Sequence, residues 1–394
     1  TARGDPFMSR PMKALAGLEP PERRTGLAAH DFQMALGMER VVLARAARVD
    51  NAPTVPSRWL KRLETVVSEE AVASMRERGS RFIGWARAID AAPDEPFALR
   101  PSPSPPLETR PSRFSVTEIE TLRRDPYAVY ARRILRLEPL EPLIRDPAAA
   151  ERGTLFHDIL AAFTEAKIAP VRTDALERLC EIARIRFGEE ELPADVEAVW
   201  WPRLIAMLPE FLAWERGRAG FIRTSKAEAG ARPFPIGETG VTLSGRADRI
   251  DILRDGSAAI IDYKTGSSPS KRQAHVLLSP QLALEAALLA RGAFGGIAPT
   301  NASELLYVRL KARGKVEQES ILKAGTGPNA SEKSAPQLAE EAWRRLGELI
   351  AHYQDPATGY LSRALPFRET DLTGDYDHLA RVLEWSAGGE DSGE

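Results

Sequence analysis

The segment from Ser244 to Gly266, SGRADRIDILRDGSAAIIDYKTG, restricts the possible folds of this chain more than any other part of its sequence. Two runs of aliphatic or alternating side chains flank Arg-Asp-Gly, a pattern typical of antiparallel strands joined by a tight turn. Side chains on a strand point alternately to its two faces, so Asp262 and Lys264 must share a face. A carboxylate and an ammonium are therefore expected on one surface of a sheet.

The position of Asp248 relative to this pair depends on the register of the hairpin. A three-residue loop, 254–256, whose glycine takes the left-handed conformation, places Asp248 opposite Asp262 and on the same face. A two-residue turn would instead place Asp248 opposite Tyr263, on the other face. A shared site for the two aspartates therefore predicts the longer turn.

The chemistry of these side chains suggests a metal site. Facing carboxylates at cross-strand distance repel each other, which raises one pKa unless a cation lies between them. Oxygen ligands favour a hard divalent ion, and Mg²⁺, which keeps several waters, is the expected occupant. Lys264 beside a metal-bound water would orient the water, help to deprotonate it, or offset the charge of a phosphodiester under attack. Hydrolysis of phosphodiesters suits such a set.

A simpler interpretation is that these charges form a solvated face or a surface ion pair. However, Ala258 to Ile261 run directly into Asp262, which indicates a central strand, where unpaired charges are costly. This context favours the functional interpretation.

The composition limits the class of protein. A chain of 394 residues exceeds what one hydrophobic core usually organises, so two domains are expected. No stretch approaches the apolar run of a membrane-spanning helix, so no membrane contact is expected. The one cysteine, Cys180, fits a reducing, cytoplasmic setting and excludes an all-cysteine zinc site or iron–sulfur cluster within this chain. Lys and Arg number 54 and Asp and Glu 56, so any argument for nucleic-acid binding must be local.

Composition shifts divide the chain. Pro and Ser dominate residues 93–112, which favours an extended, solvated linker after the mixed helices and strands of residues 1–92. Residues 113–386 contain helices, then strands punctuated by Gly and Pro from 220 to 264, then helix, strand and helix, which is the order of an α/β domain. Residues 387–394 are small and acidic, and are expected to be disordered and removable.

Two helix starts are readable. Ser115 and Glu118 have the spacing of a capping box, and that helix should break at Asp125-Pro126. Ser279 is expected to cap the helix of SPQLALEAALLARGAF, with Pro280 at its first position.

The pattern G-x-x-D-R-I-D followed by D-Y-K-T-G resembles the catalytic hairpin of RecB-like nucleases, a group of the PD-(D/E)xK superfamily. Gly153-Thr-Leu-Phe-His157 is similar to the G-x-x-x-H helix of that group, and Gln281-Leu282 to its Q-L helix. The resemblance implies an α/β fold: a restriction-endonuclease-like core with a central mixed β-sheet flanked by helices, preceded by a partial helicase-like segment.

The same resemblance implies roles for individual residues. The implied metal ligands are His157, Asp248, Asp262 and the backbone carbonyl of Tyr263, with Mg²⁺ as the cofactor and Mn²⁺ expected to substitute. The implied catalytic residues are Asp248, Asp262, Lys264 and Gln281, the last at the rim of the site. Glu228 lies where the family often has a further acidic residue. Taken alone, His157 would more often be a core histidine, Gln281 a solvated side chain and Glu228 a surface residue.

Three pieces spread along the chain narrow the resemblance to the AddB family, subunits of double-strand-break repair helicase-nucleases, in its alphaproteobacterial style. They are VVLARAARVDNAPTVPSRWLKRL, RFSVTEIETLRRDPYAVYARRILRL and GYLSRALPFRETDLTGDYDHLARVLEWS. The family implies an exonuclease-type deoxyribonuclease that cuts single-stranded DNA, on the 5'-terminated strand, beside an AddA helicase-nuclease partner. Residues 1–92 would be the C-terminal fragment of a helicase-like domain.

Several residues depart from the family pattern. Ala44-Arg45-Ala46 replaces T-R-A and no G-x-x-x-x-G-K-[ST] loop occurs, so no ATPase activity is expected. Asp125-Pro126 replaces the Cys-Pro pair through which some AddB proteins bind an iron–sulfur cluster, so no such cluster is expected. Glu285 replaces a tyrosine one turn after the glutamine, and would either add negative charge to the site or point away.

Local basic residues are candidates for DNA contact. Lys271 and Arg272 are favoured because they lie a short loop after Lys264. A second group has interleaved tyrosines that would stack on bases, and is equally compatible with a solvated helix face: Arg123, Arg124, Arg132 and Arg133, with Tyr127 and Tyr130.

Two other functions stay open on the sequence alone. One is a catalytically inactive nuclease fold that binds DNA or serves as an assembly scaffold in the same complex. The other is a metal-independent α/β binding module. The nuclease is favoured because every active-site residue that the family resemblance implies is present: His157, Asp248, Asp262, Lys264 and Gln281.

Overall fold

A computed structural model describes residues 8–19, 21–49, 52–91, 98–140, 149–190, 192–311, 316–325, 331–365 and 374–387. The chain divides into two compact units, Thr1–Pro96 and Phe97–Glu394. The predicted disordered tail lies outside the described residues except for Ala387.

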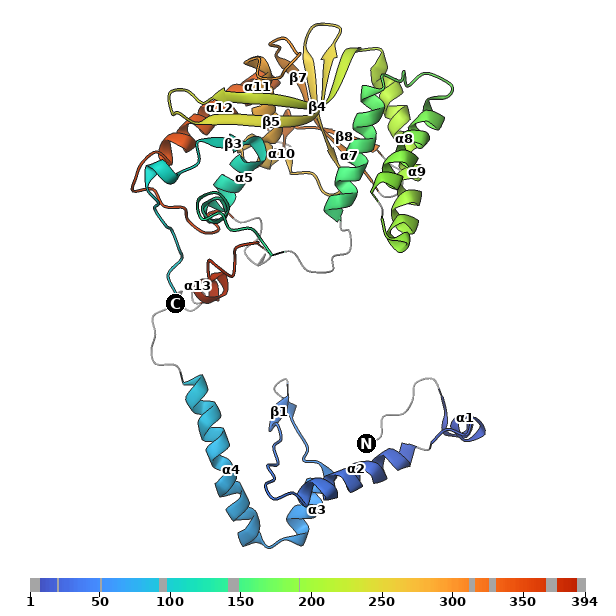
Figure 1. The fold of residues 1–394 in the computed structure, drawn as a ribbon, viewed down its shortest axis with the longest axis vertical. Coiled ribbons are helices and arrows are strands. Elements are labelled where there is room, and N and C mark those ends of the chain that lie inside the picture. The colour runs from blue at the N-terminus through green and yellow to red at the C-terminus, as the bar shows by residue number, and fades with distance from the viewer. Residues whose placement is uncertain are drawn as a thin grey trace. The chain divides into compact units, whose positions relative to one another are not determined.

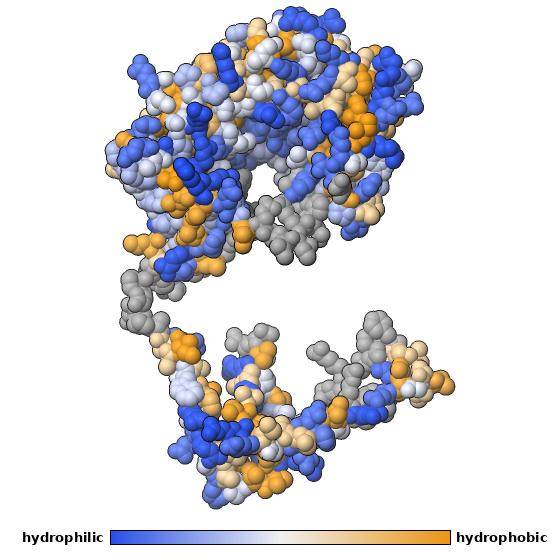
Figure 2. Space-filling model, in the orientation of Figure 1, coloured by the Kyte–Doolittle hydropathy of each residue, from blue (hydrophilic) through white to orange (hydrophobic). Residues whose placement is uncertain are grey.

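The N-terminal unit consists of helices and one short hairpin (Figure 1). Its elements are α1 (Arg10–Leu15), α2 (Pro21–Leu36), β1 (Arg48–Val49), β2 (Ala52–Pro53), α3 (Arg58–Val66) and α4 (Glu69–Asp90). None of its side chains whose burial is described is buried, and large apolar ones such as Met34, Val42 and Trp85 are exposed. Figure 2 shows hydrophobic residues at the surface of this unit. The described part of this unit therefore has no hydrophobic core of its own.

The C-terminal unit is built on a mixed sheet of six strands, in agreement with the expected α/β core. The strands are β3 (Arg113–Ser115), β4 (Ile222–Pro235), β5 (Thr242–Leu253), β6 (Ala258–Lys264), β7 (Ala302–Leu310) and β8 (Val316–Ser320). Along the order β3-β5-β6-β7-β8, the β3–β5 and β6–β7 pairs are parallel and the others antiparallel. Strand β4 pairs antiparallel with the other edge of β5, so β5 and β6 lie inside the sheet.

Helices cover both faces of this sheet (Figure 1). One face packs on α7 (Ala149–Glu165), α8 (Ala175–Glu189) and α9 (Ala194–Ala219) through Ile261, Tyr263 and Leu306. The other packs on α5 (Val116–Arg124), α11 (Gln281–Ala290) and α12 (Ala335–His352) through Ile250, Ile260 and Leu305. The remaining elements are η1 (Leu107–Thr109), α6 (Pro126–Val129), η2 (Tyr130–Ile134), α10 (Lys271–His275), β9 (Lys323–Ala324), β10 (Ser331–Glu332) and α13 (Val382–Ala387). No helix among the described residues has the length and apolarity needed to cross a bilayer.

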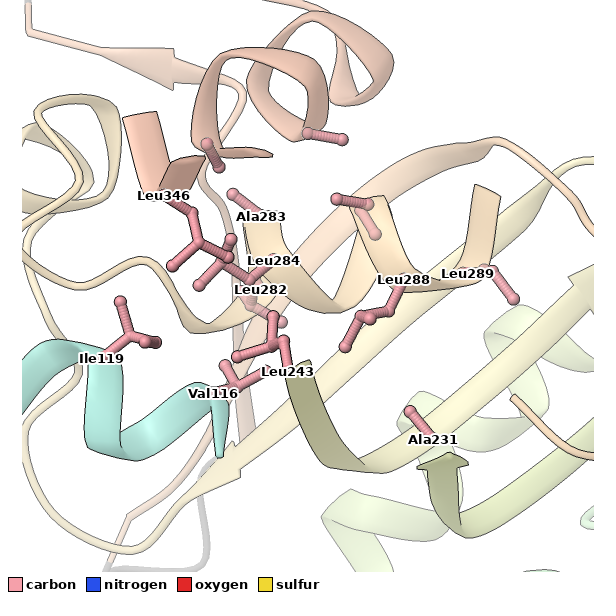
Figure 3. Packing of buried hydrophobic residues seen from close by; sticks show 14 of the residues in the cluster. Val116, Ile119, Ala231, Leu243, Leu282, Ala283, Leu284, Leu288, Leu289 and Leu346 are labelled. Atoms are coloured by element: carbon pink, nitrogen blue, oxygen red, sulfur yellow. The ribbon is translucent and has the colours of Figure 1, made fainter. Parts of the chain in front are cut away.

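Helix α11 lies at the centre of the second core because its sequence is apolar almost all round. Figure 3 shows its leucines between α5, α12 and β5, with Leu282 and Leu288 near Leu243, and Leu284 near Leu346. Each such leucine is fully buried and contributes on the order of 1.5–3 kcal/mol to folding. This helix is therefore held firmly against the strand that carries Asp248.

The helix starts were predictable only where the cap is local. The capping box of α5 is confirmed, since Ser115 Oγ accepts from Glu118 N at 3.2 Å and Glu118 Oε2 accepts from Ser115 N at 2.8 Å. The predicted cap at Ser279 is wrong. Helix α11 begins at Gln281 without a side-chain cap, and Ser279 Oγ donates instead to Glu120 Oε2 at 2.9 Å. A tertiary partner has outcompeted the helix end for that hydroxyl.

Residues 98–112, from the proline-rich segment, lie against the C-terminal unit. The buried Arg110 guanidinium donates to the backbone carbonyls of Tyr353 at 2.7 Å and Thr358 at 3.2 Å. Tyr360 N donates to Pro103 O at 2.8 Å. Apart from η1, this stretch contains no helix or strand, as its composition favours, but it is bound to the C-terminal unit and belongs to it.

Gly245 has no room for a side chain. A Cβ there would lie 2.9 Å from Val116 Cγ2 and 3.5 Å from Leu288 Cδ1. Gly245→Ala is therefore expected to lower the free energy of unfolding by about 1–3 kcal/mol, measured by chemical denaturation. The control is Gly217→Ala in α9, where a Cβ meets nothing within 4 Å and the change should stabilise the helix slightly. Equal effects of the two substitutions would contradict this account of the packing.

Candidate active site

The turn between β5 and β6 is the three-residue loop that the sequence predicts. Gly256 has φ 88°, and Leu253 N donates to Ser257 O at 2.8 Å. The paired residues are Arg249 with Ile261 and Ile252 with Ala258. Continued by one residue, this register sets Asp248 opposite Asp262, so the predicted register is confirmed.

Asp248 lies where the two strands separate. Pairing of β5 with β6 ends at Arg249, and β5 pairs with β3 from Thr242 to Ser244. Tyr263 N donates to Asp248 Oδ2 at 2.8 Å. An aspartate side chain thus accepts a hydrogen bond at a point where the antiparallel ladder would supply a backbone carbonyl. The separation places the Tyr263 peptide beside the Asp248 carboxylate.

Asp262 and Lys264 form a buried ion pair on the α11 face of the sheet. Lys264 Nζ lies 2.9 Å from Asp262 Oδ1 and 2.7 Å from Oδ2, and Asp262 is only 1% exposed. Within the described chain, Oδ2 accepts no well-directed hydrogen bond. Burial lowers the pKa of Lys264, but attraction to Asp262 outweighs burial and raises it overall.

The two aspartates hold their protons unusually well. Burial raises the pKa of Asp248 to about 6, and the nearby Glu228 carboxylate adds to the rise. Burial also raises the pKa of Asp262 to about 6, with repulsion from Asp248 as a further cause. Both effects favour any cation that comes between them.

His157 reaches Asp248 from α7, on the opposite side of the sheet. Its Nδ1 lies 3.3 Å from Asp248 Oδ2, and burial lowers the pKa of His157, so its ring is neutral at pH 7. One turn earlier, Gly153 lets α7 approach the end of β6 closely, since a Cβ there would lie 3.2 Å from Thr265 Oγ1. A neutral imidazole is the form that ligates metals.

Glu228 lies on β4 opposite Asp248, between the pairs Ala227 with Arg249 and Ala229 with Ala247. Its φ of 43° is in the left-handed region, which is rare for a residue with a side chain and marks a local irregularity of the strand. Burial raises the pKa of Glu228, whose nearest cation is Arg246 at 3.7 Å. Glu228 thus lies near Asp248.

Glu285 lies one turn after Gln281 on α11. Gln281 Nε2 donates to Glu285 Oε1 at 3.2 Å, and Glu285 is 1% exposed. Burial, then repulsion from Asp262 and Asp248, raises the pKa of Glu285 well above its ordinary value. Of the two orientations left open by the sequence, the structure has Glu285 facing the site.

The donor atoms suit a hard divalent ion by their chemistry, with two carboxylates, a neutral imidazole and a nearby peptide carbonyl. Among the described residues, however, no three His, Cys, Asp or Glu side chains stand together as a ready-made metal-binding group. The donors are engaged with each other and with their neighbours: Asp262 with Lys264, and Asp248 with Tyr263 N and His157. An ion between the aspartates would therefore compete with Lys264 for the oxygens of Asp262.

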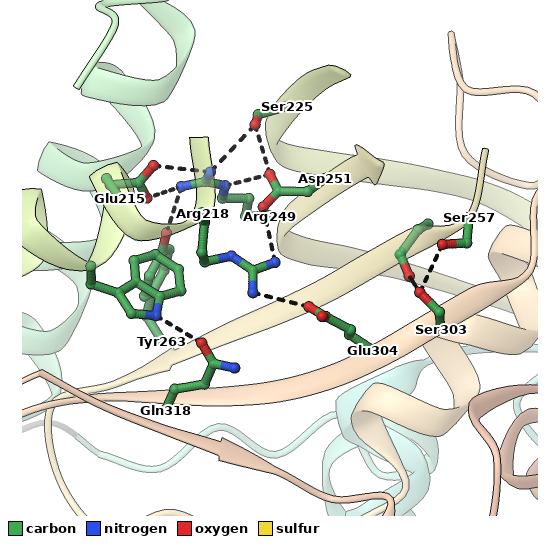
Figure 4. A network of polar contacts seen from close by, with 12 residues as sticks. Glu215, Arg218, Ser225, Arg249, Asp251, Ser257, Tyr263, Ser303, Glu304 and Gln318 are labelled. Carbon is green, nitrogen blue, oxygen red and sulfur yellow. Dashed lines mark hydrogen bonds and ion pairs between the residues drawn. The ribbon is translucent and has the colours of Figure 1, made fainter. Parts of the chain in front are cut away.

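A buried ion network supports the hairpin from the other face, and sequence reasoning missed it (Figure 4). Arg249, 2% exposed, pairs with both oxygens of Glu215 from α9 and lies 2.7 Å from Asp251 Oδ1. The same guanidinium donates to the Tyr263 hydroxyl at 3.3 Å. Arg249 and Tyr263 directly follow Asp248 and Asp262, so alternation along the two strands was the available signal. The network fixes the backbone on which both aspartates stand.

The basic residues predicted to contact DNA differ in how strongly they are bonded to other groups of this chain. Arg123 donates to the backbone carbonyls of Val276 and Leu277, and the buried Arg124 lies 2.9 Å from Glu120 Oε1. Lys271 Nζ is 3.9 Å from Glu319, and Arg272 is exposed on α10. Contact with DNA stays a prediction for all four.

A cavity of about 490 Å³ opens beside Gln281. Arginines line it, each facing a carboxylate: Arg124 with Glu120, Arg132 with Asp375, Arg133 with Glu118 and Arg363 with Asp377. The charges of these lining arginines are therefore offset by carboxylates, while most of the accessible wall is apolar.

Asp125, which stands in place of a cysteine by the family resemblance, anchors the C-terminal segment. Asp125 Oδ1 accepts from Arg363 N at 2.9 Å, and Arg363 Nε lies 3.2 Å from Asp377 Oδ1. These contacts hold Arg363 and Asp377 near the end of α5, although burial raises the pKa of Asp125.

Comparison with known proteins assigns the family. The profile of the PD-(D/E)XK nuclease superfamily matches residues 113–366. An "Uncharacterized protein" of Rickettsia bellii is 24% identical over 297 residues, which cover 75% of this chain and 35% of that protein. One of Rickettsia felis is 26% identical over 303 residues, with the same coverage.

This chain thus spans 35% of the length of these curated relatives. A solved structure, "Crystal structure of SSO0001", covers 60% of this chain and 76% of its own at 14% identity, with a TM-score of 0.24, too low to carry an argument. Since the matched profile spans more than half of the chain and includes the hairpin of Asp248, Asp262 and Lys264, the chain belongs to the PD-(D/E)XK nuclease superfamily.

Proposed function

We propose that this chain is the nuclease domain of an AddB-type subunit of a double-strand-break repair helicase-nuclease. It is a Mg²⁺-dependent deoxyribonuclease of the exonuclease type that hydrolyses single-stranded DNA, on the 5'-terminated strand. The observation that carries the proposal is the meeting of three groups at the end of the hairpin. Lys264 Nζ lies 2.7 Å from Asp262 Oδ2, Tyr263 N donates to Asp248 Oδ2 at 2.8 Å, and His157 Nδ1 lies 3.3 Å from Asp248.

Each residue of the site has a separate role in this proposal. His157, Asp248, Asp262 and the Tyr263 carbonyl would hold Mg²⁺, which supplies a water of lowered pKa and polarises the phosphodiester. Lys264 offsets negative charge on the attacked phosphate, and Gln281 orients the strand at the rim. Lys271 and Arg272, just beyond β6, hold the DNA backbone by their positive charge.

The subunit assignment rests on different observations. The N-terminal unit lacks a core among its described residues, as expected of the end of a helicase-like domain whose remainder is elsewhere. The curated relatives are about three times the length of the matched segment. An AddA partner that unwinds duplex DNA would supply the single strand.

One observation favours the second candidate, an inactive nuclease fold that serves as a DNA-binding or assembly scaffold. Both oxygens of Asp262 face Lys264 rather than a vacant ligand position. A nuclease assay separates the two candidates.

End-labelled single-stranded DNA is expected to be cut in Mg²⁺, to stay intact in excess chelator, and to be cut again when Mn²⁺ is added. Activity should rise from pH 5 to pH 7 at limiting metal, because the carboxyls of Asp248 and Asp262, with pKa values of about 6, must lose protons to ligate. Equal cutting with and without chelator, or none under any condition, contradicts the nuclease.

The stability of the metal-free fold should change with pH in the opposite direction to the activity, falling as the pH rises. The folded pKa of Asp262, about 6, exceeds the unfolded value near 3.8, so this group's contribution to stability is present below pH 4 and lost as pH rises through 6. Denaturation of the chelated chain at pH 4.5 and 7 measures this loss, which Mn²⁺ should reverse at pH 7.

A further inference from the structure

Glu285 is a buried acid that the proposed ligand set does not use. It lies in the middle of α11, whose other residues after Gln281 are apolar, and it is 1% exposed. An acid in such surroundings is costly unless it has partners. It must therefore be either neutral or directed at a cation.

Only one of its two oxygens has a partner. Oε1 accepts from Gln281 Nε2 at 3.2 Å, whereas Oε2, though buried, accepts no hydrogen bond from the described residues. An unmet buried acceptor costs roughly 1–3 kcal/mol. Packing alone gives no reason to keep this group in a helix where leucine or alanine occupies the neighbouring positions.

The cation to consider is Lys264. Burial lowers the pKa of Lys264, but Asp262, Asp248 and Glu285 all raise it, so the Glu285 carboxyl lies within electrostatic range of the ammonium. The Lys264 side chain also lies against Tyr307, with Nζ 5.9 Å from the ring centroid. Lys264 thus has a second acidic neighbour on the α11 side of the sheet.

Two cations compete for the carboxylate of Asp262: the Lys264 ammonium and the proposed divalent ion. Both of its oxygens face Lys264, and under the proposed function the same oxygens ligate a divalent ion. An ion bound to Asp262 competes with the Lys264 ammonium for these oxygens and weakens the pair. Without another acceptor this side chain, 28% exposed, would turn to solvent and away from the phosphodiester.

We propose that Glu285 is the second acceptor of Lys264, a positioning residue that takes over the ammonium when Asp262 ligates a divalent ion. This inference rests on the proposed function. Gln281 holds one oxygen of Glu285 in place, and the other, Oε2, receives Lys264. The lysine stays inside the site beside the scissile phosphate, and Asp262 is released at little cost.

Calorimetric titration with Mn²⁺, without DNA, tests this exchange. Glu285→Leu is expected to weaken Mn²⁺ binding about tenfold, since Lys264, whose pair with Asp262 the ion weakens, has no second acceptor. Glu285→Gln keeps an acceptor oxygen but no charge, and should weaken binding about threefold. Glu340→Gln is the matched control, because Glu340 is exposed on α12 with Arg291 as its partner, and it should bind Mn²⁺ like the parent.

A crystal structure with Ca²⁺ gives a direct readout that does not depend on folding of the variants. The expected result is Lys264 Nζ within hydrogen-bond distance of Glu285 Oε2. Lys264 still on Asp262, Lys264 in solvent, or Glu285 itself on the ion would each overturn the proposal. If the parent binds Mn²⁺ and cuts DNA while Glu285→Leu binds Mn²⁺ equally well, only this inference fails. A parent that neither binds Mn²⁺ nor cuts DNA removes the proposed function and this inference with it.

Discussion

Asp262→Asn is expected to lower the rate of single-strand cleavage about a thousandfold, because losing roughly 4 kcal/mol of metal-dependent transition-state stabilisation corresponds to that factor. The same substitution should raise the free energy of unfolding of the metal-free chain at pH 7. It removes a buried carboxylate whose pKa burial has raised to about 6. A variant that is more stable yet inactive identifies a group kept for chemistry rather than for folding.

The measurement is a single-turnover cleavage assay beside chemical denaturation of the same preparations. Asp255→Asn is the control, since Asp255 lies in the turn of the same hairpin and accepts from Ser257 N at 2.9 Å, away from the site. It should cut DNA like the parent. Cleavage by Asp262→Asn within tenfold of the parent would exclude Asp262 from the chemistry.

Arg249→Met is expected to lower the free energy of unfolding by about 3–5 kcal/mol, because it leaves Glu215 buried without its cation and Asp251 with only Arg218, at 3.6 Å. Both acids are nearly inaccessible, with side-chain exposures of 7% and 0%. The hairpin loses its support on the α9 side, so cleavage should also fall. Thermal and urea denaturation measure the first effect.

Glu304→Gln is the matched control for this network. Glu304 pairs with Arg218 at 2.9 Å but is 38% exposed, so its loss should cost at most about 1 kcal/mol. If Arg249→Met costs no more than Glu304→Gln, the network does not fix the hairpin as described.

The hairpin was predictable because its determinants are local. Gly256 in a three-residue loop set the register, and the period of two along each strand then set the faces of Asp248 and Asp262. The capping box at Ser115 succeeded for the same reason, since both partners lie within one turn.

The side-chain contacts that could not be predicted from the sequence are those between segments far apart in the chain. Ser279 was expected to cap a helix, but Glu120, far away in the chain, takes its hydroxyl. The approach of His157 to Asp248 was implied only by family resemblance, because it requires α7 to lie against the end of β6. Arg249 was overlooked although it alternates with Asp248, since its partner Glu215 comes from another helix.

The orientation of Glu285 was readable in principle. A helix that is apolar almost all round must be buried, and any acid within it is then buried too. Which neighbours that acid meets still depends on the strand beneath.

The most direct test of the account is an anomalous difference map from crystals soaked in Mn²⁺. The account predicts one strong peak bonded to oxygens of both Asp248 and Asp262, at about 2.2 Å. A peak elsewhere, or no peak while Lys264 remains on Asp262 at saturating Mn²⁺, would contradict it.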